Sequence, residues 1–177
     1  MNKIISFLKF LFMKIYFGKC LDMCPQNIIN GKMEVIVNKG SLIRIKRGMH
    51  STGPLYLKAI NGGKMKIGQN CFFNHNCSIT ASNNINIGDS CCFGNNLVIV
   101  DHDHNFRKLG NDIFVSGEVI IGNNVWIGAN VTVLRNTYIG DNCVIGANCI
   151  VKGNIESNTI YTENNNFIKR KINRSIL

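Results

Sequence analysis

Aliphatic residues recur at every sixth position through the second half of the chain. Written in sixes from Ile121, the sequence runs IGNNVW, IGANVT, VLRNTY, IGDNCV, IGANCI and VKGNIE, without a break to Glu156. The same register appears upstream from Ile67, and it resumes from Ile87 after a slip of two residues. A six-residue period fits neither a helix, whose apolar positions recur about every 3.6 residues, nor a half-buried strand, whose period is about 2.

Six residues suffice for one short strand and one corner. In that arrangement the first and fifth side chains point inward. Gly or Asn beside the aliphatic residue suits a tight corner, because positive φ costs these residues little. Three such faces close a triangular coil of about 18 residues, and coils stack at the ~4.8 Å spacing of paired strands. The pattern therefore predicts an all-β solenoid of hexapeptide repeats.

The solenoid domain is expected to span residues 25–163. Its four regular coils begin at Ile67, Ile87, Ile121 and Ile139. One or two less regular coils precede them, with candidate strands at 35–37, 42–43 and 55–57.

Three segments interrupt or flank the repeat. Residues 1–24 are apolar and basic, and they predict a helical leader. Between Ile99 and Ile121 the spacing is 22 residues instead of 6, so the 16 extra residues predict an extruded loop at about 100–120. The tail at 164–177 is polar and basic.

Lysines divide the leader into short apolar runs. The four lysines are Lys3, Lys9, Lys14 and Lys19. The segment is too short and too charged to span a bilayer, and no signal-peptide cleavage site follows it. Two interpretations stay open: the leader covers the open end of the solenoid, or it lies on the inner face of an anionic membrane. We therefore expect a cytoplasmic protein, with peripheral membrane contact as the second interpretation.

Charge and cysteine content narrow the function classes. The 20 basic and 10 acidic residues give a net charge of +10, which favours anionic partners. The basic residues are not interleaved with aromatic residues, so nucleic-acid binding is not expected. Of the 8 Cys, five occupy the fifth repeat position, which favours reduced thiols packed in a core, without metal. These are Cys71, Cys77, Cys91, Cys143 and Cys149.

The unbroken repeat from Ile121 to Val151 follows a loop that carries Asp101, His102, Asp103 and His104 in succession. This combination resembles the hexapeptide-repeat acyltransferases, and most of all the galactoside, maltose and polysaccharide O-acetyltransferases. The resemblance covers about residues 67–151. It implies a left-handed parallel β-helix, acetyl-CoA as acyl donor, and a homotrimer with active sites between subunits. It also implies transfer to a saccharide hydroxyl, as in capsule, lipopolysaccharide or exopolysaccharide synthesis.

The family's general base is a loop histidine. Counted without gaps from Phe93, its position falls on His104, and His102 is the second candidate because loops slip. A neutral imidazole suits the task, since it removes the acceptor's hydroxyl proton as the oxygen attacks the thioester. By the same register Asn74 matches an acceptor-binding asparagine, and Trp126 matches an aromatic residue beside the acyl and acceptor groups.

Ala129 and Ala147 match the family positions whose backbone groups hold the pantetheine arm of CoA. They lie one coil apart, so their backbones stack. Lys152 is a candidate contact for the CoA phosphates, although the residues after it depart from the family's usual ending. The tail adds further basic candidates at Lys169, Arg170, Lys171 and Arg174.

Three other functions remain as alternatives. N-acyl transfer to an amino sugar or amino acid uses the same fold. A zinc carbonic anhydrase of this fold would require three well-placed histidines. The chain has His50, His75, His102 and His104, with no His-x4-His pair. A structural coil without activity would leave the histidine loop and Trp126 without a role.

Overall fold

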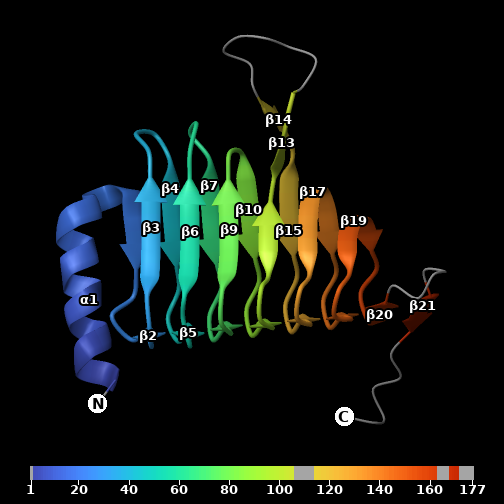
Figure 1. Cartoon of the computed structure of the whole chain (residues 1–177), viewed down its shortest axis with the longest axis horizontal. Helices are drawn as coiled ribbons and strands as arrows, with labels where there is room; N and C mark the ends of the chain where they lie inside the picture. The colour runs from blue at the N-terminus through green and yellow to red at the C-terminus, as the bar shows by residue number, and fades with distance from the viewer. Residues whose placement is uncertain (1, 106–113, 163–167, 172–177) are drawn as a thin grey trace.

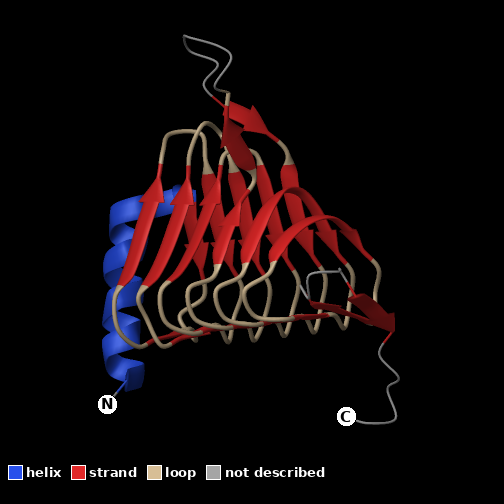
Figure 2. Ribbon diagram, turned by 45° about the vertical axis from the view of Figure 1, so that its right-hand side comes forward, coloured by secondary structure: helices blue, strands red, loops and turns tan. Residues whose placement is uncertain are grey.

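The computed structural model describes residues 2–105, 114–162 and 168–171. Helix α1 (Asn2–Phe17) and a short 3-10 turn (Gly18–Cys20) precede a left-handed parallel β-solenoid (Figure 1). The predicted fold class is confirmed. Figure 2 shows the triangular cross-section of the coils, with the helix standing at one end.

Each coil contributes one strand to each of three faces. The first face contains β1 (Leu21–Met23), β4 (Leu42–Ile45), β7 (Lys64–Ile67), β10 (Asn84–Ile87) and β15 (Glu118–Ile121). The second face contains β2 (Ile28–Ile29), β5 (His50–Ser51), β8 (Phe72–Phe73), β11 (Cys92–Phe93), β16 (Trp126–Ile127), β18 (Val144–Ile145) and β20 (Thr159–Thr162). The third face contains β3 (Met33–Val37), β6 (Leu55–Ala59), β9 (Cys77–Ala81) and β12 (Val98–Val100).

Two longer strands bend around a corner and serve two faces. They are β17 (Thr132–Ile139) and β19 (Ile150–Ile155), whose first residues pair on the third face and whose last residues pair on the first. The chain ends its described part with β21 (Ile168–Lys171), which pairs antiparallel with β20. About six turns are therefore complete.

The register of the coils stacks identical positions above one another. Ile67 pairs with Ile87, Ile87 with Ile121, and Ile121 with Ile139. All four side chains are buried, as are the five fifth-position cysteines. The inward direction of the first and fifth residues is confirmed, and so are the strands expected near 35–37, 42–43 and 55–57.

The corners use Gly and Asn for different reasons, which corrects one expectation. Positive φ falls on the fourth residue of the repeat, such as Asn124 (55°) and Asn130 (58°). Gly88, in second position, has no positive φ; a Cβ there would lie 2.4 Å from the carbonyl oxygen of Gly122 in the next coil. Glycine is thus required by the close approach of stacked backbones rather than by its own torsion angle.

The core cysteines act as small apolar fillers. The Cys91 thiol donates to the Gly122 carbonyl (3.1 Å), and the Cys143 thiol donates to the Glu156 carbonyl (3.1 Å). Burial raises the pKa of the Cys77 thiol to about 11. At neutral pH the Cys77 thiol therefore stays protonated and packs as a neutral side chain.

Helix α1 covers the open end of the first coil. Ser6 accepts a hydrogen bond from the Ile29 amide (2.9 Å), and the Lys9 ammonium donates to the Gly31 carbonyl (2.6 Å). Met13 packs into the core with only 8% of its surface exposed. A solenoid end left bare would expose its apolar interior, and this helix removes that exposure. Among the described residues, no helix is long and apolar enough to cross a bilayer.

Candidate active site

The extruded loop is a hairpin that leaves the coil between the third and first faces. Its arms are β13 (His102–His104) and β14 (Phe114–Ser116), which pair antiparallel. The Gly117 amide donates to the Asp101 carbonyl (2.7 Å) and closes the base of the hairpin. The hairpin projects from the upper edge of the solenoid in Figures 1 and 2.

Asp101 anchors this hairpin with a fully buried carboxylate. It accepts hydrogen bonds from the backbone amides of Ser82 (2.7 Å) and Asn83 (2.8 Å), which belong to the coil below. It also lies 3.0 Å from Nδ1 of His102. A carboxylate in this position favours the tautomer with a proton on Nδ1, which leaves Nε2 of His102 as an acceptor. The His102 side chain is only 11% exposed.

His104 lies two residues further along the same strand and is exposed. Its ring centroid is 4.9 Å from that of Phe114, and the His102 ring is 4.7 Å from the same phenyl group. Asp103, between the two histidines, forms an ion pair with Arg135 of β17. Both histidines therefore share one aromatic support, and two carboxylates tie their strand to the coil.

Asn74 lies at a different corner, between the second and third faces. Its Oδ1 accepts hydrogen bonds from the His75 amide (2.9 Å) and from the Thr52 hydroxyl (3.2 Å). The backbone N–H of Asn74 donates a hydrogen bond to the Phe93 carbonyl (3.0 Å) in the next coil. Within residues 2–105, 114–162 and 168–171, the Asn74 side-chain NH2 group donates to no protein acceptor, while its Oδ1 accepts both of the hydrogen bonds named above.

Ala129 and Ala147 stack at this second-to-third corner, as the sequence predicted. The Asn148 amide donates to the Ala129 carbonyl (2.9 Å). A Cβ on Gly128 would lie 2.7 Å from the Ala147 nitrogen, so stacked backbone, with only small side chains, forms the corner. Trp126 precedes it on β16 with its side chain 56% exposed.

One chain does not bring all the predicted residues together. The histidines are at the third-to-first corner, whereas Asn74, Ala129 and Ala147 are at the second-to-third corner. Lys152 is exposed in β19 at the bend between the third and first faces, which is the hairpin's corner. Among the tail residues, Lys169, Arg170 and Lys171 belong to β21, and Arg174 lies outside the described residues.

Two residues of the site had no assigned role in the sequence. Asp101 is visible in the sequence only as part of the Asp-His-Asp-His run, and no sequence pattern singles out Arg135. The signal for Asp101 is its place directly after a strand whose alternate residues are inward, which puts a carboxylate at a buried position. Within residues 2–105, 114–162 and 168–171, no three His, Cys, Asp or Glu side chains are grouped to hold a metal ion.

Comparisons with known families match the repeat in both halves of the solenoid. A model described as bacterial transferase hexapeptide (six repeats) matches residues 118–153. A second, described as the hexapeptide repeat of succinyl-transferase, matches residues 64–100. No curated protein sequence matches the chain.

Solved structures share the fold over most of the chain. A mutant N-acyltransferase from Bacillus cereus has a TM-score of 0.73 at 18% identity, over 90% of this chain and 87% of that one. A hexapeptide-repeat acetyltransferase from Vibrio cholerae has a TM-score of 0.60 at 18% identity, over 97% of this chain and 86% of that one. A maltose O-acetyltransferase from Clostridium difficile has a TM-score of 0.50 at 26% identity, over 90% of this chain and 74% of that one. The chain therefore carries the hexapeptide repeat of bacterial transferases over residues 64–100 and 118–153, and it shares its fold with acyltransferases built from that repeat.

Proposed function

We propose that the protein transfers an acetyl group from acetyl-CoA to a hydroxyl group of a saccharide, with a hairpin histidine as general base. The observation that carries this proposal is an exposed His104 on a hairpin fixed by the buried Asp101. A base must reach its substrate and still be held in place, and this strand meets both conditions. His102 is less accessible, and its contact with Asp101 suits a residue that orients the strand.

The chemistry requires no covalent intermediate on the protein. The acceptor hydroxyl gives its proton to Nε2 of the imidazole while its oxygen attacks the thioester carbonyl. The tetrahedral intermediate then breaks its carbon–sulfur bond, and the imidazolium returns the proton to the departing CoA thiolate. His102 fills the same role if its Nε2, rather than that of His104, meets the acceptor.

The stacked backbone at Ala129 and Ala147 supports acetyl-CoA as the donor. A pantetheine arm is narrow and carries two amides, which suit a corner built of backbone and small side chains. Trp126 lies beside this corner, where an indole ring can contact the acyl or acceptor group. Among the structural neighbours, a Bacillus cereus N-acyltransferase was crystallised with 3-hydroxybutyryl-CoA and a galactoside acetyltransferase with coenzyme A. Lys152 is proposed as a contact for CoA phosphates.

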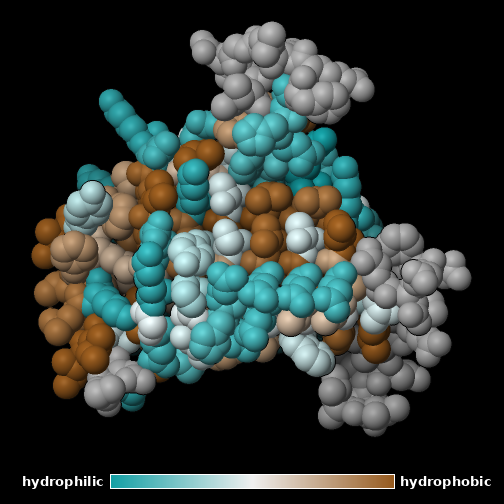
Figure 3. All heavy atoms as spheres, viewed as in Figure 1, coloured by the Kyte–Doolittle hydropathy of each residue, from teal (hydrophilic) through white to brown (hydrophobic). Residues whose placement is uncertain are grey.

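A second copy of the chain is needed to complete this site, because the base lies at a different corner from Ala129 and Ala147. In a closed ring of three copies, the hairpin corner of one subunit meets the second-to-third corner of the next. Figure 3 shows an apolar patch on the third face near the hairpin. Its strands carry outward Val98, Leu134 and Ile150, the last 56% exposed. We therefore propose a homotrimer with Asn74 and Trp126 facing a partner's histidines.

The test is release of CoA thiol from acetyl-CoA, measured against a panel of saccharides and their amino-sugar counterparts. The proposal expects turnover with hydroxyl acceptors and little extra rate when the hydroxyl is replaced by an amine. Turnover confined to amino sugars or amino acids would establish the N-acyl alternative. Absence of thiol release with every acceptor, from protein that binds acetyl-CoA, would overturn the assignment of acceptor class.

A further inference from the structure

Helix α1 has two apolar sides, and only one of them is used by the solenoid. The inward side carries Ser6 and Met13, which contact the first coil. The opposite side is exposed: Ile4 is 75% and Ile15 is 78% accessible. The remaining members of this outward face are Leu8, Leu11, Phe12 and Tyr16, all exposed. A monomer seldom leaves so much contiguous apolar surface in water without a partner for it.

Lysines border this outward face. Lys3 and Lys14 are three helical turns apart, so they lie along one edge of it. The helix contains no acidic residue. Within the described part of the chain, neither lysine forms an ion pair with a carboxylate. The edge of the apolar face is therefore cationic and uncompensated.

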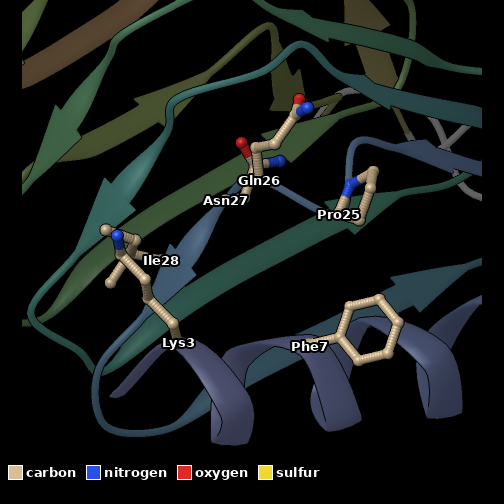
Figure 4. A pocket seen from close by; sticks show the side chains of 6 residues that line it. All are labelled: Lys3, Phe7, Pro25, Gln26, Asn27 and Ile28. Atoms are coloured by element: carbon tan, nitrogen blue, oxygen red, sulfur yellow. The ribbon is translucent and has the colours of Figure 1, made fainter. Parts of the chain in front are cut away.

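A pocket opens at the same edge, between the first turn of α1 and the first corner of the solenoid (Figure 4). Its volume is about 470 Å³, and its lining includes Lys3 and Phe7 from the helix and Gln26 and Asn27 from the corner. Asn27 is only 3% exposed and accepts a hydrogen bond from the Met49 amide (2.9 Å). Its Nδ2 is buried without a partner among the described residues.

This pocket combines two features that fit an anionic headgroup. Lys3 supplies positive charge, and Phe7 supplies an apolar wall from the same helix (Figure 4). Both residues lie at the edge of the outward apolar face, so the pocket and the face suit the same ligand.

We propose that the outward face of α1 docks the protein on an anionic lipid bilayer, with the helix lying in the plane of the surface. Binding of this kind scales with the apolar area inserted and with the attraction of cations to anionic lipids. The helix has 16 residues, fewer than the ~20 that a bilayer span requires. It can therefore enter the interface while its inward side stays on the solenoid.

Charge favours a membrane over a second copy of the helix as the occupant. Two copies of α1 packed face to face would bring Lys3 and Lys14 of each helix together, without an acidic residue on either to compensate. The whole chain carries a net charge of +10, which attracts it to anionic lipid. An anionic bilayer matches both the apolar face and its basic edge.

Co-sedimentation of the full chain with vesicles tests the proposal without reference to catalysis. We expect binding to equimolar phosphatidylcholine and phosphatidylglycerol, much weaker binding to phosphatidylcholine alone, and weakening by high salt. The double variant Phe12→Glu/Ile15→Glu should abolish binding. The control Ile36→Glu changes an exposed residue of β3, 42% accessible, and should bind like the parent protein.

A lysine pair gives a second test that leaves the apolar face intact. Lys3→Gln/Lys14→Gln should weaken binding to anionic vesicles by about tenfold or more. Its control, Lys58→Gln/Lys64→Gln, removes the same charge from exposed strand positions and should have little effect. Circular dichroism monitors the fold of every variant, and if the glutamate pair does not fold, the lysine pair decides.

Three results would overturn the proposal. One is no sedimentation of the parent protein with anionic vesicles. Another is an equal loss of vesicle binding in the Lys3/Lys14 and Lys58/Lys64 variants, which would show that net charge alone accounts for the effect. The third is a drop in mass by light scattering for Phe12→Glu/Ile15→Glu, which would identify a second copy as the occupant.

Discussion

The first coils and the later coils have the same triangular cross-section, but the chain turns their corners in different ways. Arg47 and Gln69, equivalent residues of successive early coils, are 22 positions apart, whereas Asn123 and Asp141 in the later coils are 18 apart. The early corners are longer and place positive φ on glycines as well as asparagines: Gly62 (80°), which has open space around it, follows Asn61 (55°). The later corners place positive φ on asparagine and use glycine where backbones touch. The short corners thus stack closely at Ala129, and the longer corners lie at the end of the solenoid that α1 covers.

The largest predicted difference concerns glycine. Gly88→Ala places a Cβ 2.4 Å from a backbone oxygen, so the coil must shift, and we expect a loss of about 3 kcal/mol in the free energy of unfolding. Gly62→Ala meets no neighbour and costs only the left-handed backbone, about 1–2 kcal/mol. Urea unfolding of both variants measures the two changes in the free energy of unfolding. Equal losses would show that backbone torsion, not close approach, governs both kinds of corner.

Substitutions of corner asparagines should differ less in their effect on stability between the later and the early coils. Asn130 bridges its neighbours, since its Oδ1 accepts from Asn96 (2.8 Å) and its Nδ2 donates to Asn148 (3.0 Å). Asn130→Ala should cost about 2 kcal/mol, from the lost ladder and the positive φ together. Asn61 has φ 55° in an early corner, with no side-chain ladder among the described residues, so Asn61→Ala should cost about 1 kcal/mol. A larger loss at Asn61 would contradict the ladder's contribution.

Surface ion pairs should matter least. Arg44 and Asp22 pair across early coils at 2.9 Å, with both side chains about half exposed. Exposed pairs of this type contribute little because water and salt screen them, so Arg44→Gln should change stability by less than about 0.5 kcal/mol. Thermal unfolding at low and high salt checks it. A loss comparable to that of Gly88→Ala would mean that charge pairs hold the early coils together.

The same contrast explains what the sequence could predict about the fold. From Ile67 onward the first and fifth positions specify the coils, because one side chain in each short strand must be inward. Before Ile67 the 22-residue spacing hides the six-residue period, so only individual strands were predictable. The role of Gly88 was not predictable either, since contact between stacked backbones is a tertiary property that no local pattern contains.

The candidate site was predictable in its parts but not in its arrangement. The 22-residue spacing between Ile99 and Ile121 predicted the extruded loop, and the repeat register indicated the corner of Ala129. The burial of Asp101 depends on amides of Ser82 and Asn83, which belong to the preceding coil and are distant in sequence from any motif. That Lys152 shares the hairpin's corner, and Ala129 does not, follows from how β17 and β19 bend.

His104 on the hairpin is the proposed general base. The most direct measurement is the kcat for thiol release from acetyl-CoA, with a saccharide acceptor, in His104→Ala and His102→Ala. We expect His104→Ala to lower kcat by roughly 10²–10⁴-fold while acetyl-CoA binding survives, and His102→Ala to cost much less. Near-full activity in His104→Ala with a large loss in His102→Ala would transfer the role to His102. Full activity in both variants would contradict a hairpin base altogether.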